Sequence, residues 1–323
     1  KRCINIKPEW WQECTFKEDL LYGIRTGDIW LNKVKYDEQN KRIRGNVCLE
    51  VYLPSRGTCL LQHCNLGACE YDDISKAFVT GMSELCKLHS QTNVGQSGEY
   101  LSPDVDKQVG LGVLGLANLL RRNGVSYEQF GRALENFNNN EPVRSPAYAL
   151  VTEINAGIEQ AAQIARNAGM VRAFAIAPTA SCSYRSVDLD GYTCTPEIAP
   201  PISQTVDRDS GTFGVQTFNY GDVEIASEVG YENYKRVADG IMRLYEKTGL
   251  LHGYSFNTWS DMITYDEAFI QEWLDSPQTS MYYSLQVMSD TQDKTDAYAA
   301  LKDSDVDDYL DSLLNQPTCD CQE

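Results

Sequence analysis

Segments with the character of β-strands alternate with longer amphipathic segments along most of the chain. Short stretches rich in apolar and aromatic residues cover 171–176, 253–257 and 281–285. Apolar residues recur at helical spacing over 145–168 and 228–248. Because consecutive parallel strands need a long crossover, which is usually a helix, this order predicts an α/β fold with a largely parallel sheet.

Other elements are predicted from capping residues and local periodicity. A short strand that runs into a loop is predicted over 59–67. Asp72 or Asp73 caps the next helix, which carries apolar residues at helical spacing, namely Ile74, Phe78, Met82 and Leu85. Further helices are predicted over 104–123, after the capping box of Ser126 and Gln129, and from a cap at Thr264 with Glu267 to Leu274.

One short segment, 46–50, carries reactive side chains. In extended backbone successive side chains point to opposite faces, so Asn46, Cys48 and Glu50 would share one face. The apolar residues between them would share the other face and support the polar set. A free cysteine is more often a small buried hydrophobic residue than a catalytic one, so the triplet alone leaves both interpretations open.

Composition restricts what such a site can serve. The net charge of −18 disfavours general binding to nucleic acid or to an anionic membrane. No run of about 18 apolar residues exists, so no membrane span is expected. The first residues lack the apolar core of a signal peptide, and the eleven cysteines form no dense framework, so we expect a reduced, cytoplasmic protein. The chain does not begin with methionine, which leads us to expect further sequence upstream.

Two other patterns have simpler explanations than a ligand site. The segment 110–115 matches the dinucleotide-binding fingerprint, but the residues before it resemble a helix start instead of the required strand. We therefore interpret its small residues as close packing of a buried helix. Cys59, Cys64 and Cys69, with His63 nearby, are five residues apart, whereas structural zinc ligands usually pair at spacings of two to four. We expect no metal site in this chain.

Three further stretches each have a functional and a plain interpretation. The stretch 178–181 follows a predicted strand and suits an anion cradle or a simple turn equally well. Tyr282 and Tyr283 would point to opposite faces of a strand, where adjacent tyrosines are most often packing residues. Cys319 and Cys321 lie in an acidic tail, for which thiol–disulfide exchange, metal binding or no role remain open. The stretch 178–181 consists of Pro178, Thr179, Ala180 and Ser181.

Taken together and in this order, these segments resemble the large, catalytic subunit of class I ribonucleotide reductase. Asn46-x-Cys48-x-Glu50 matches the finger-loop motif of that family, and Cys59, six residues before Asn65, matches its second redox cysteine. The remaining matches run from about residue 20 to the end of the chain. They are the strand before the finger loop (26–32), a helix (111–115), the substrate-phosphate loop (177–181), the radical-transfer pair Tyr282 and Tyr283, and the reducing tail with Cys319 and Cys321.

The resemblance implies a ten-stranded α/β barrel with the finger loop at its centre. Residues 1–288 would form the C-terminal portion of this catalytic barrel, and residues 289–323 an acidic, flexible redox tail. The implied enzyme is a ribonucleoside-diphosphate reductase, which makes deoxyribonucleotides for DNA replication. A full subunit of this family is expected to form a homodimer and to bind a radical-generating small (beta) subunit.

The resemblance also assigns roles to the site residues. The metallocofactor of the partner subunit supplies a radical that passes through Tyr283 and Tyr282 to Cys48, and no cofactor is bound by this chain itself. The Cys48 thiyl radical takes the ribose 3′ hydrogen, Glu50 is the general base on the 3′ hydroxyl, and Asn46 hydrogen-bonds the sugar hydroxyls.

Electrons for the reduction are implied to come from thiols. A cysteine pair that includes Cys59 reduces the substrate, and the tail cysteines Cys319 and Cys321 then reduce that pair. An external reductant of the thioredoxin or glutaredoxin type restores the tail. The 178–181 stretch holds the substrate phosphate.

Three features of the family have no counterpart in this sequence: its first redox cysteine, its nucleotide specificity site and its dimer helices. All three lie upstream of the finger loop in the family, so we expect this chain to be the C-terminal part of the subunit. Two alternatives stay open, a cobalamin-dependent ribonucleotide reductase and a non-catalytic half of a split reductase that needs an N-terminal partner. The tyrosine pair favours class I, because the cobalamin enzymes share the finger loop but use no tyrosine relay.

Overall fold

The computed structural model describes residues 2–92, 94–209 and 214–288, so the expected redox tail with Cys319 and Cys321 lies outside the described residues. The helices are α1 (Pro8–Glu13), α2 (Lys17–Arg25), α3 (Ile74–Gln91), α4 (Leu116–Arg122), α5 (Tyr127–Asn138), α6 (Pro146–Asn167), α7 (Ala180–Ser183), α8 (Ala226–Val229), α9 (Tyr231–Glu246) and α10 (Glu267–Asp275). The strands are β1 (Arg2–Ile6), β2 (Ile29–Lys33), β3 (Lys35–Tyr36), β4 (Arg42–Gly45), β5 (Tyr52–Leu53), β6 (Leu61–Asn65), β7 (Gln108–Leu114), β8 (Arg172–Ile176), β9 (Thr205–Asp209), β10 (Val215–Asn219), β11 (Leu251–Tyr254), β12 (Thr258–Trp259), β13 (Ser280–Met281) and β14 (Ser284–Leu285).

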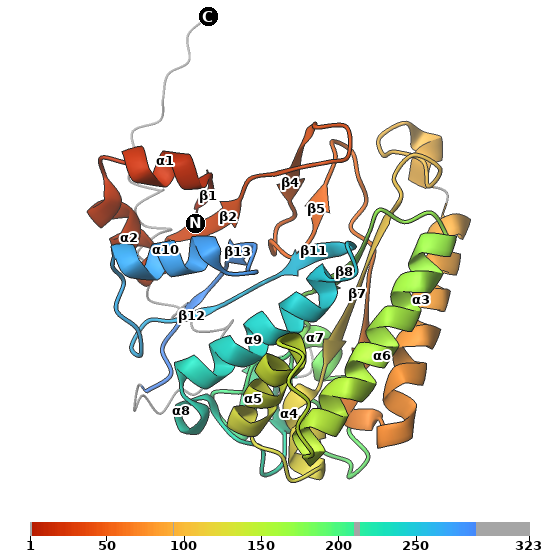
Figure 1. Ribbon diagram of the computed structural model, residues 1–323, viewed down its shortest axis with the longest axis vertical. Helices are drawn as coiled ribbons and strands as arrows, with labels where there is room; N and C mark the ends of the chain where they lie inside the picture. The colour runs from red at the N-terminus through yellow and green to blue at the C-terminus, as the bar shows by residue number, and fades with distance from the viewer. Residues whose placement is uncertain (1, 93, 210–213, 289–323) are drawn as a thin grey trace, which may run out of the picture.

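The largest sheet has four parallel strands in the order β11-β8-β7-β6. β7 lies in the interior of this sheet, and every residue of it is buried. Helices α3, α6 and α9 lie along one face of the sheet (Figure 1). α3 buries the apolar residues predicted for it, Ile74, Phe78, Met82 and Leu85. The α/β class with a parallel sheet is confirmed.

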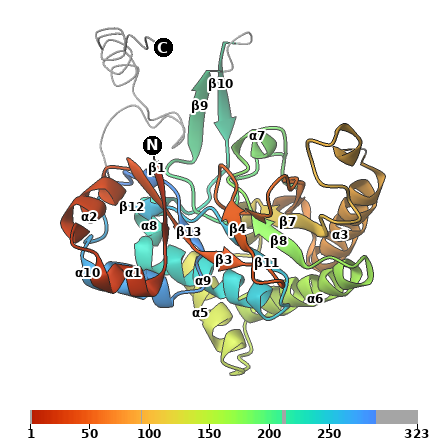
Figure 2. The same cartoon turned by 90° about the horizontal axis from the view of Figure 1, so that it is seen from above.

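The hairpin of β4 and β5 lies between this sheet and a second one with the order β1-β2-β13 (Figure 2). Tyr52 of β5 is fully buried and contacts both sheets. Its backbone N–H donates a hydrogen bond to Nδ1 of His252 on β11 at 3.1 Å. Its hydroxyl lies 2.8 Å from Oδ1 of Asn32 on β2. These contacts fix the hairpin between the two sheets.

A closed ten-stranded barrel is not formed by the described residues. Their strands form sheets of two to four, and the outer strands β6 and β11 of the largest sheet each pair with one other described strand. A sheet forms a closed barrel only when its first and last strands are hydrogen-bonded to each other. The β4–β5 hairpin, which carries residues 46–50 in its turn, lies between the two sheets.

The prediction of one helix over 104–123 is wrong. The segment contains strand β7 followed by helix α4. Gly110 and Gly112 lie within β7, and a Cβ on Gly112 would overlap the Ala175 carbonyl oxygen of the neighbouring strand. A buried strand and a buried helix are both continuous apolar runs, so periodicity cannot distinguish them. These glycines lie inside a strand, whereas the glycines of a dinucleotide-binding loop follow one.

Gly112→Ala is expected to destabilise the fold by about 1–3 kcal/mol or more, as overpacking in a dense core does. The added methyl group would overlap the Ala175 carbonyl and come 2.6 Å from His63 Nε2. The control is Gly124→Ala at the end of α4, where φ is +62° and the space is open, so that only backbone strain of about 1 kcal/mol is added. Urea denaturation measures both, and an equal loss in the two variants would contradict the packing argument.

Several predicted elements are confirmed, and others differ at their ends. The capping box of Ser126 and Gln129 starts α5, and α6 and β8 lie where predicted. The predicted helix 228–248 is divided into α8 and α9 by Gly230, which has a positive φ. The cap of α10 is Asp266 instead of Thr264, because the Asp266 side chain accepts a hydrogen bond from the Phe269 N–H.

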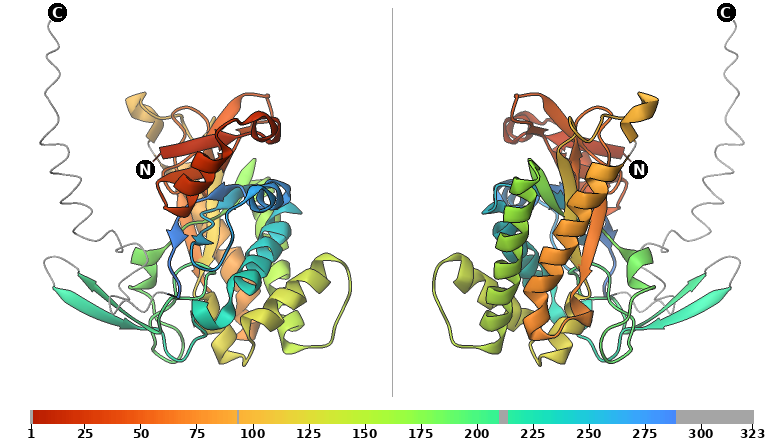
Figure 3. Two further views of the ribbon diagram at one scale, coloured as in Figure 1. Left: turned by 90° about the vertical axis from the view of Figure 1, so that its left-hand side faces the viewer. Right: turned by 90° about the vertical axis from the view of Figure 1, so that its right-hand side faces the viewer.

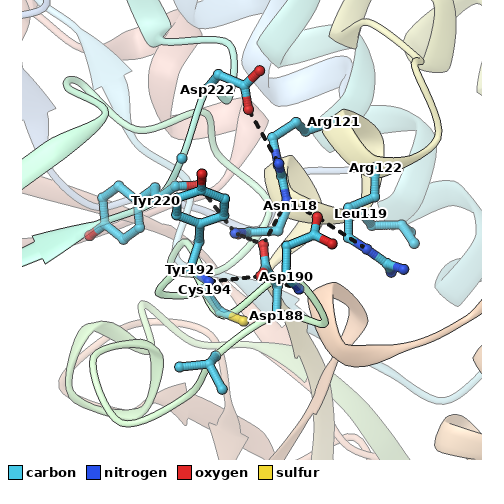
Figure 4. A network of polar contacts seen from close by, with 12 residues as sticks. Asn118, Leu119, Arg121, Arg122, Asp188, Asp190, Tyr192, Cys194, Tyr220 and Asp222 are labelled. Carbon is cyan, nitrogen blue, oxygen red and sulfur yellow. Dashed lines mark hydrogen bonds and ion pairs between the residues drawn. The ribbon is translucent and has the colours of Figure 1, made fainter.

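A polar network ties α4 to the loop-rich segment 186–222 (Figure 4). Asn118 is fully buried, and its Nδ2 donates to Asp188 Oδ2 at 2.9 Å. Its Oδ1 accepts a hydrogen bond from the backbone N–H of Thr195 at 2.8 Å. Arg121 pairs with three carboxylates of the same segment, those of Asp188, Asp190 and Asp222. The network fixes the chain that leads to Glu197, a residue of the site described below.

The same segment contains the hairpin of β9 and β10, which was expected to be loop and projects away from the body of the molecule (Figure 3). Most of its side chains are exposed, so the sequence carries little hydrophobic alternation by which a strand could be recognised. Among the helices of the described residues, none combines the length and the apolar character needed to cross a membrane.

Candidate active site

The sequence predicts extended backbone for 46–50, but this segment is the turn of the β4–β5 hairpin. Antiparallel pairing of β4 with β5 forces the chain to reverse direction within six residues, 46–51. The Asn46 N–H donates to the Val51 carbonyl at 2.9 Å, and Leu49 adopts a positive φ of 65°. The apolar residues therefore do not share a face, since Val47 is 80% exposed whereas Leu49 is buried.

The turn nevertheless brings the predicted polar side chains together. Asn46 Nδ2 donates to Glu50 Oε1 at 2.9 Å and lies 3.5 Å from Cys59 Sγ. Asn46 Oδ1 accepts from the Val51 N–H, which fixes the orientation of the amide. Cys59 precedes β6 and does not lie in a strand, but it reaches the turn as expected.

Ser255 completes this group from the other side. Its hydroxyl lies 2.6 Å from the Cys48 carbonyl oxygen and 3.2 Å from Glu50 Oε2. Its backbone N–H donates to the Ile176 carbonyl at the end of β8. Ser255 thus connects the turn to the strand that leads into the 178–181 stretch.

Burial and neighbouring groups shift the pKa values of the ionisable side chains of the turn. Burial raises the pKa of Glu50, and hydrogen bonds from Asn46 and Ser255 offset part of that effect. Burial and the neighbouring Glu50 carboxylate raise the pKa of Cys48, and the same two causes raise the pKa of Cys59 to about 11. A nucleophilic cysteine needs a lowered pKa, so these thiols are suited to keeping their hydrogen atoms.

The two tyrosines lie next to Cys48. The hydroxyl of Tyr282 is hydrogen-bonded to the Cys48 thiol and to Tyr283. The two phenol rings are 4.2 Å apart between centroids, and Trp30 of β2 packs 4.6 Å from the Tyr282 ring. A thiol, a phenol and a second phenol therefore form one continuous chain.

The prediction that the two tyrosine rings point to opposite faces of one strand, 281–285, is wrong. That segment is interrupted, because β13 pairs with β2 and β14 pairs with β12. Tyr282 and Tyr283 lie between these two strands, where the alternation of side chains does not apply. The interruption is what allows both rings to lie on the same side, beside Trp30.

The 178–181 stretch follows β8 and leads into α7, a single short turn of helix. Thr179 has a positive φ of 56°, and its Oγ1 accepts a hydrogen bond from the Glu197 N–H at 2.8 Å. The N–H of Ala177 donates to Nε2 of His63, whose pKa is lowered to about 4 by burial. Pro178, Thr179, Ala180 and Ser181 are half-buried or exposed and therefore accessible to a ligand.

No family model matches the sequence, and no curated protein matches it. Among solved structures, the alpha subunit of the class Id ribonucleotide reductase of Actinobacillus ureae is similar, with a TM-score of 0.50 and 16% sequence identity. The likeness covers 89% of this chain and 65% of that subunit. The chain has the fold of a ribonucleotide reductase alpha subunit.

The family resemblance drawn from the sequence motifs is thus confirmed at the level of the reductase fold, and the chain spans about 65% of the length of the subunit it matches. The structure brings together the finger-loop residues, Cys59 and the tyrosine pair, all of which the motifs had selected. Sequence reasoning does not identify three further residues of this site, Ser255, Asn257 and Glu197. Ser255 and Asn257 alternate within the predicted strand 253–257, so a polar face of that strand was the available sign.

Glu197→Gln is expected to change how stability depends on pH. Glu197 is buried, and burial raises the pKa of its carboxyl from 4.5 to about 8. Between these values the folded protein holds a proton that the unfolded chain has released, so the free energy of unfolding falls as the pH rises. The glutamine variant should lack this fall and exceed the wild type by roughly 2–4 kcal/mol at about pH 8.5.

Urea denaturation at several pH values between about 5 and 8.5 measures this difference. Glu84→Gln on the exposed face of α3 is the matched control, because a solvated carboxylate contributes little. Parallel stability curves for wild type and Glu197→Gln would contradict the assignment of a neutral buried carboxyl.

Proposed function

We propose that this chain reduces ribonucleotides to 2′-deoxyribonucleotides through a thiyl radical on Cys48. The observation that carries the proposal is the hydrogen-bonded chain from Tyr283 through Tyr282 to Cys48, which ends beside Glu50 and Asn46. Raised thiol pKa values support hydrogen-atom chemistry over nucleophilic chemistry at this site. The 2′-deoxyribonucleotide formed in this reaction would be a precursor for DNA synthesis.

Each residue then has one task. A metallocofactor in a small (beta) subunit supplies the radical, which Tyr283 passes to Tyr282. Tyr282 then takes one hydrogen atom, a proton and an electron, from the Cys48 thiol, and the Cys48 thiyl radical takes the 3′ hydrogen of the ribose. Glu50 accepts the proton of the 3′ hydroxyl, and Asn46 hydrogen-bonds the sugar. The 2′ hydroxyl leaves as water with a proton from one of the reducing thiols, and after the reduction Cys48 returns the hydrogen atom to C3′.

The reduction requires two further electrons, which come from two thiols as they form a disulfide. Cys59 is one of them, because it lies against Asn46 within the same group. Cys319 and Cys321 would restore that pair by thiol–disulfide exchange, and a reductant of the thioredoxin or glutaredoxin type would restore the tail.

The substrate is proposed to be a ribonucleoside diphosphate held by its phosphates at the 178–181 stretch. The described sheets would form part of the ten-stranded barrel of this fold, and the complete subunit would act as a cytoplasmic homodimer. A cobalamin-dependent reductase and a non-catalytic half of a split reductase are the alternatives, and the contact between Tyr282 and Cys48 favours the tyrosine relay over cobalamin.

The test is the conversion of cytidine diphosphate to deoxycytidine diphosphate by the protein, with and without its candidate small subunit, in the presence of a dithiol. Chromatography of the nucleotides measures the product. Product that appears only with the small subunit supports the proposal. Turnover with cobalamin and no second subunit would establish the first alternative, and turnover only after addition of an N-terminal partner chain would establish the second.

A further inference from the structure

Asn257 is a buried amide that contacts two distant parts of the site. Its Oδ1 accepts a hydrogen bond from the backbone N–H of Tyr283 at 3.1 Å. Its Nδ2 lies 3.4 Å from Oε1 of Glu197, and its own N–H lies 3.4 Å from the Tyr234 hydroxyl. The residue is only 2% exposed, so each of these contacts is shielded from water.

Glu197 continues the connection toward the 178–181 stretch. Its backbone N–H donates to Thr179 Oγ1 at 2.8 Å, and its side chain is buried. Both Glu197 and Thr179 have positive φ angles, 42° and 56°, which side-chain-bearing residues rarely adopt. Such backbone conformations persist only where the surrounding contacts determine them strongly.

The carboxyl of Glu197 interacts with Asn257 and with Tyr254. Asn257 Nδ2 reaches Oε1, and the Tyr254 hydroxyl is a second hydrogen-bonding neighbour of the carboxyl. The nearby Tyr254 hydroxyl is hydrogen-bonded to Tyr234 at 2.8 Å. The Asn257–Glu197 contact is thus one of two links, with that of Tyr254, that join the loop of Glu197 to the segment of Asn257.

The interrupted strand gives this connection its importance. In a continuous strand the Tyr283 N–H would bond to a neighbouring backbone carbonyl, but Tyr283 lies between β13 and β14. The Asn257 side chain takes the place of that carbonyl. The Tyr283 carbonyl is held by the Thr258 N–H at 2.8 Å, whereas its N–H is held by the Asn257 side chain, which Glu197 contacts in turn.

We propose that Glu197 and Asn257 are positioning residues that couple phosphate binding at the 178–181 stretch to the backbone position of Tyr283. The inference rests on the proposed function and adds to it a link between the two ends of the site. A phosphate that binds the Thr179 loop would shift or tighten the Thr179–Glu197 contact, and Asn257 would transmit the change to Tyr283. A purely structural role for the same residues predicts no response of Tyr283 to a ligand.

The first test is hydrogen–deuterium exchange of the full protein with and without cytidine diphosphate. Binding should slow exchange in the peptide that contains 178–181 and also in the peptide that contains Tyr283. In Asn257→Ala and in Thr179→Val the second effect should be lost at saturating nucleotide, whereas Thr179→Ser, which keeps the hydroxyl, should retain it. Asn138→Ala is the matched control, because this half-buried amide on α5 donates to the Gly240 carbonyl of α9, outside the site.

The second test uses turnover in the presence of the small subunit. Asn257→Ala should lower kcat by about tenfold or more while KM changes less than about twofold, because the loss concerns the relay and not substrate binding. An unchanged kcat, or equal loss of kcat and of nucleotide affinity, would overturn the coupling. A Tyr283 peptide that responds to nucleotide equally in wild type and Asn257→Ala would overturn it as well.

These outcomes are separable from failure of the proposed function. If nucleotide slows exchange at 178–181 and the wild type turns over, only the coupling is at issue. If nucleotide leaves exchange at 178–181 unchanged and no deoxynucleotide forms, the proposed function is wrong and the coupling is refuted with it.

Discussion

Cys48→Ser is expected to abolish nucleotide reduction, with a loss of more than about 10⁴-fold, while the protein stays folded. A serine hydroxyl does not yield its hydrogen atom to a tyrosyl radical, so the step that Tyr282 and Cys48 share would be blocked. Each 1.4 kcal/mol added to a barrier slows a reaction about tenfold, and loss of the reacting group adds many such increments. Deoxynucleotide formation with the small subunit measures the effect.

The fold should tolerate this change. Cys48 is only half-buried, and serine is of similar size, so the free energy of unfolding should change by no more than about 1 kcal/mol. Cys14→Ser makes the same chemical change at another half-buried cysteine outside the site and should leave turnover intact. Product formation by folded Cys48→Ser would show that the thiyl assignment is wrong.

Tyr282→Phe is expected to stop turnover almost as completely, by more than about 10³-fold. The substitution removes the hydroxyl that is hydrogen-bonded to Cys48 and to Tyr283, and therefore interrupts the relay at its centre. The ring itself stays, so its packing against Trp30 is kept and stability should fall by about 1 kcal/mol at most. Assays of product and of thermal unfolding together check both parts.

Tyr245→Phe provides the matched control, since Tyr245 is a buried tyrosine on α9 that stacks on Phe174 and has no place in the relay. It should retain turnover. Normal activity in Tyr282→Phe would remove the tyrosine relay and favour the cobalamin alternative, in which no phenol carries the radical.

The fold could be predicted best where one local rule decided the structure. The Ser126 and Gln129 capping box specifies the start of α5 from two residues, and the periodicity of α3 specifies its buried face. The sequence predicts a helix in place of β7 because every residue of β7 is buried. A segment that is apolar throughout shows neither the two-residue period of a strand nor the 3.6-residue period of a helix. The turn at 46–50 was mistaken for a strand because its shape follows from the pairing of β4 with β5, which no residue within the turn specifies.

The site divides in a similar way. Asn46, Cys48 and Glu50 are close in sequence, so their grouping could be inferred from spacing even though the inferred backbone was wrong. Glu197 and Asn257 are 60 residues apart, and Ser255 and Glu50 are 205 apart. Contacts at such separations are determined by the packing of β8, β11 and the hairpin, and one sequence without that packing does not reveal them.

The raised pKa of Cys59 has a consequence for how this protein should respond to electrophiles and peroxides. Cys59 lies at the surface, where a cysteine is ordinarily among the first to be alkylated or oxidised. Because partial burial and the neighbouring Glu50 raise its pKa to about 11, only about one molecule in 10³–10⁴ carries the reactive thiolate at pH 7.4. An electrophile should therefore label this exposed thiol more slowly than its exposure alone would suggest.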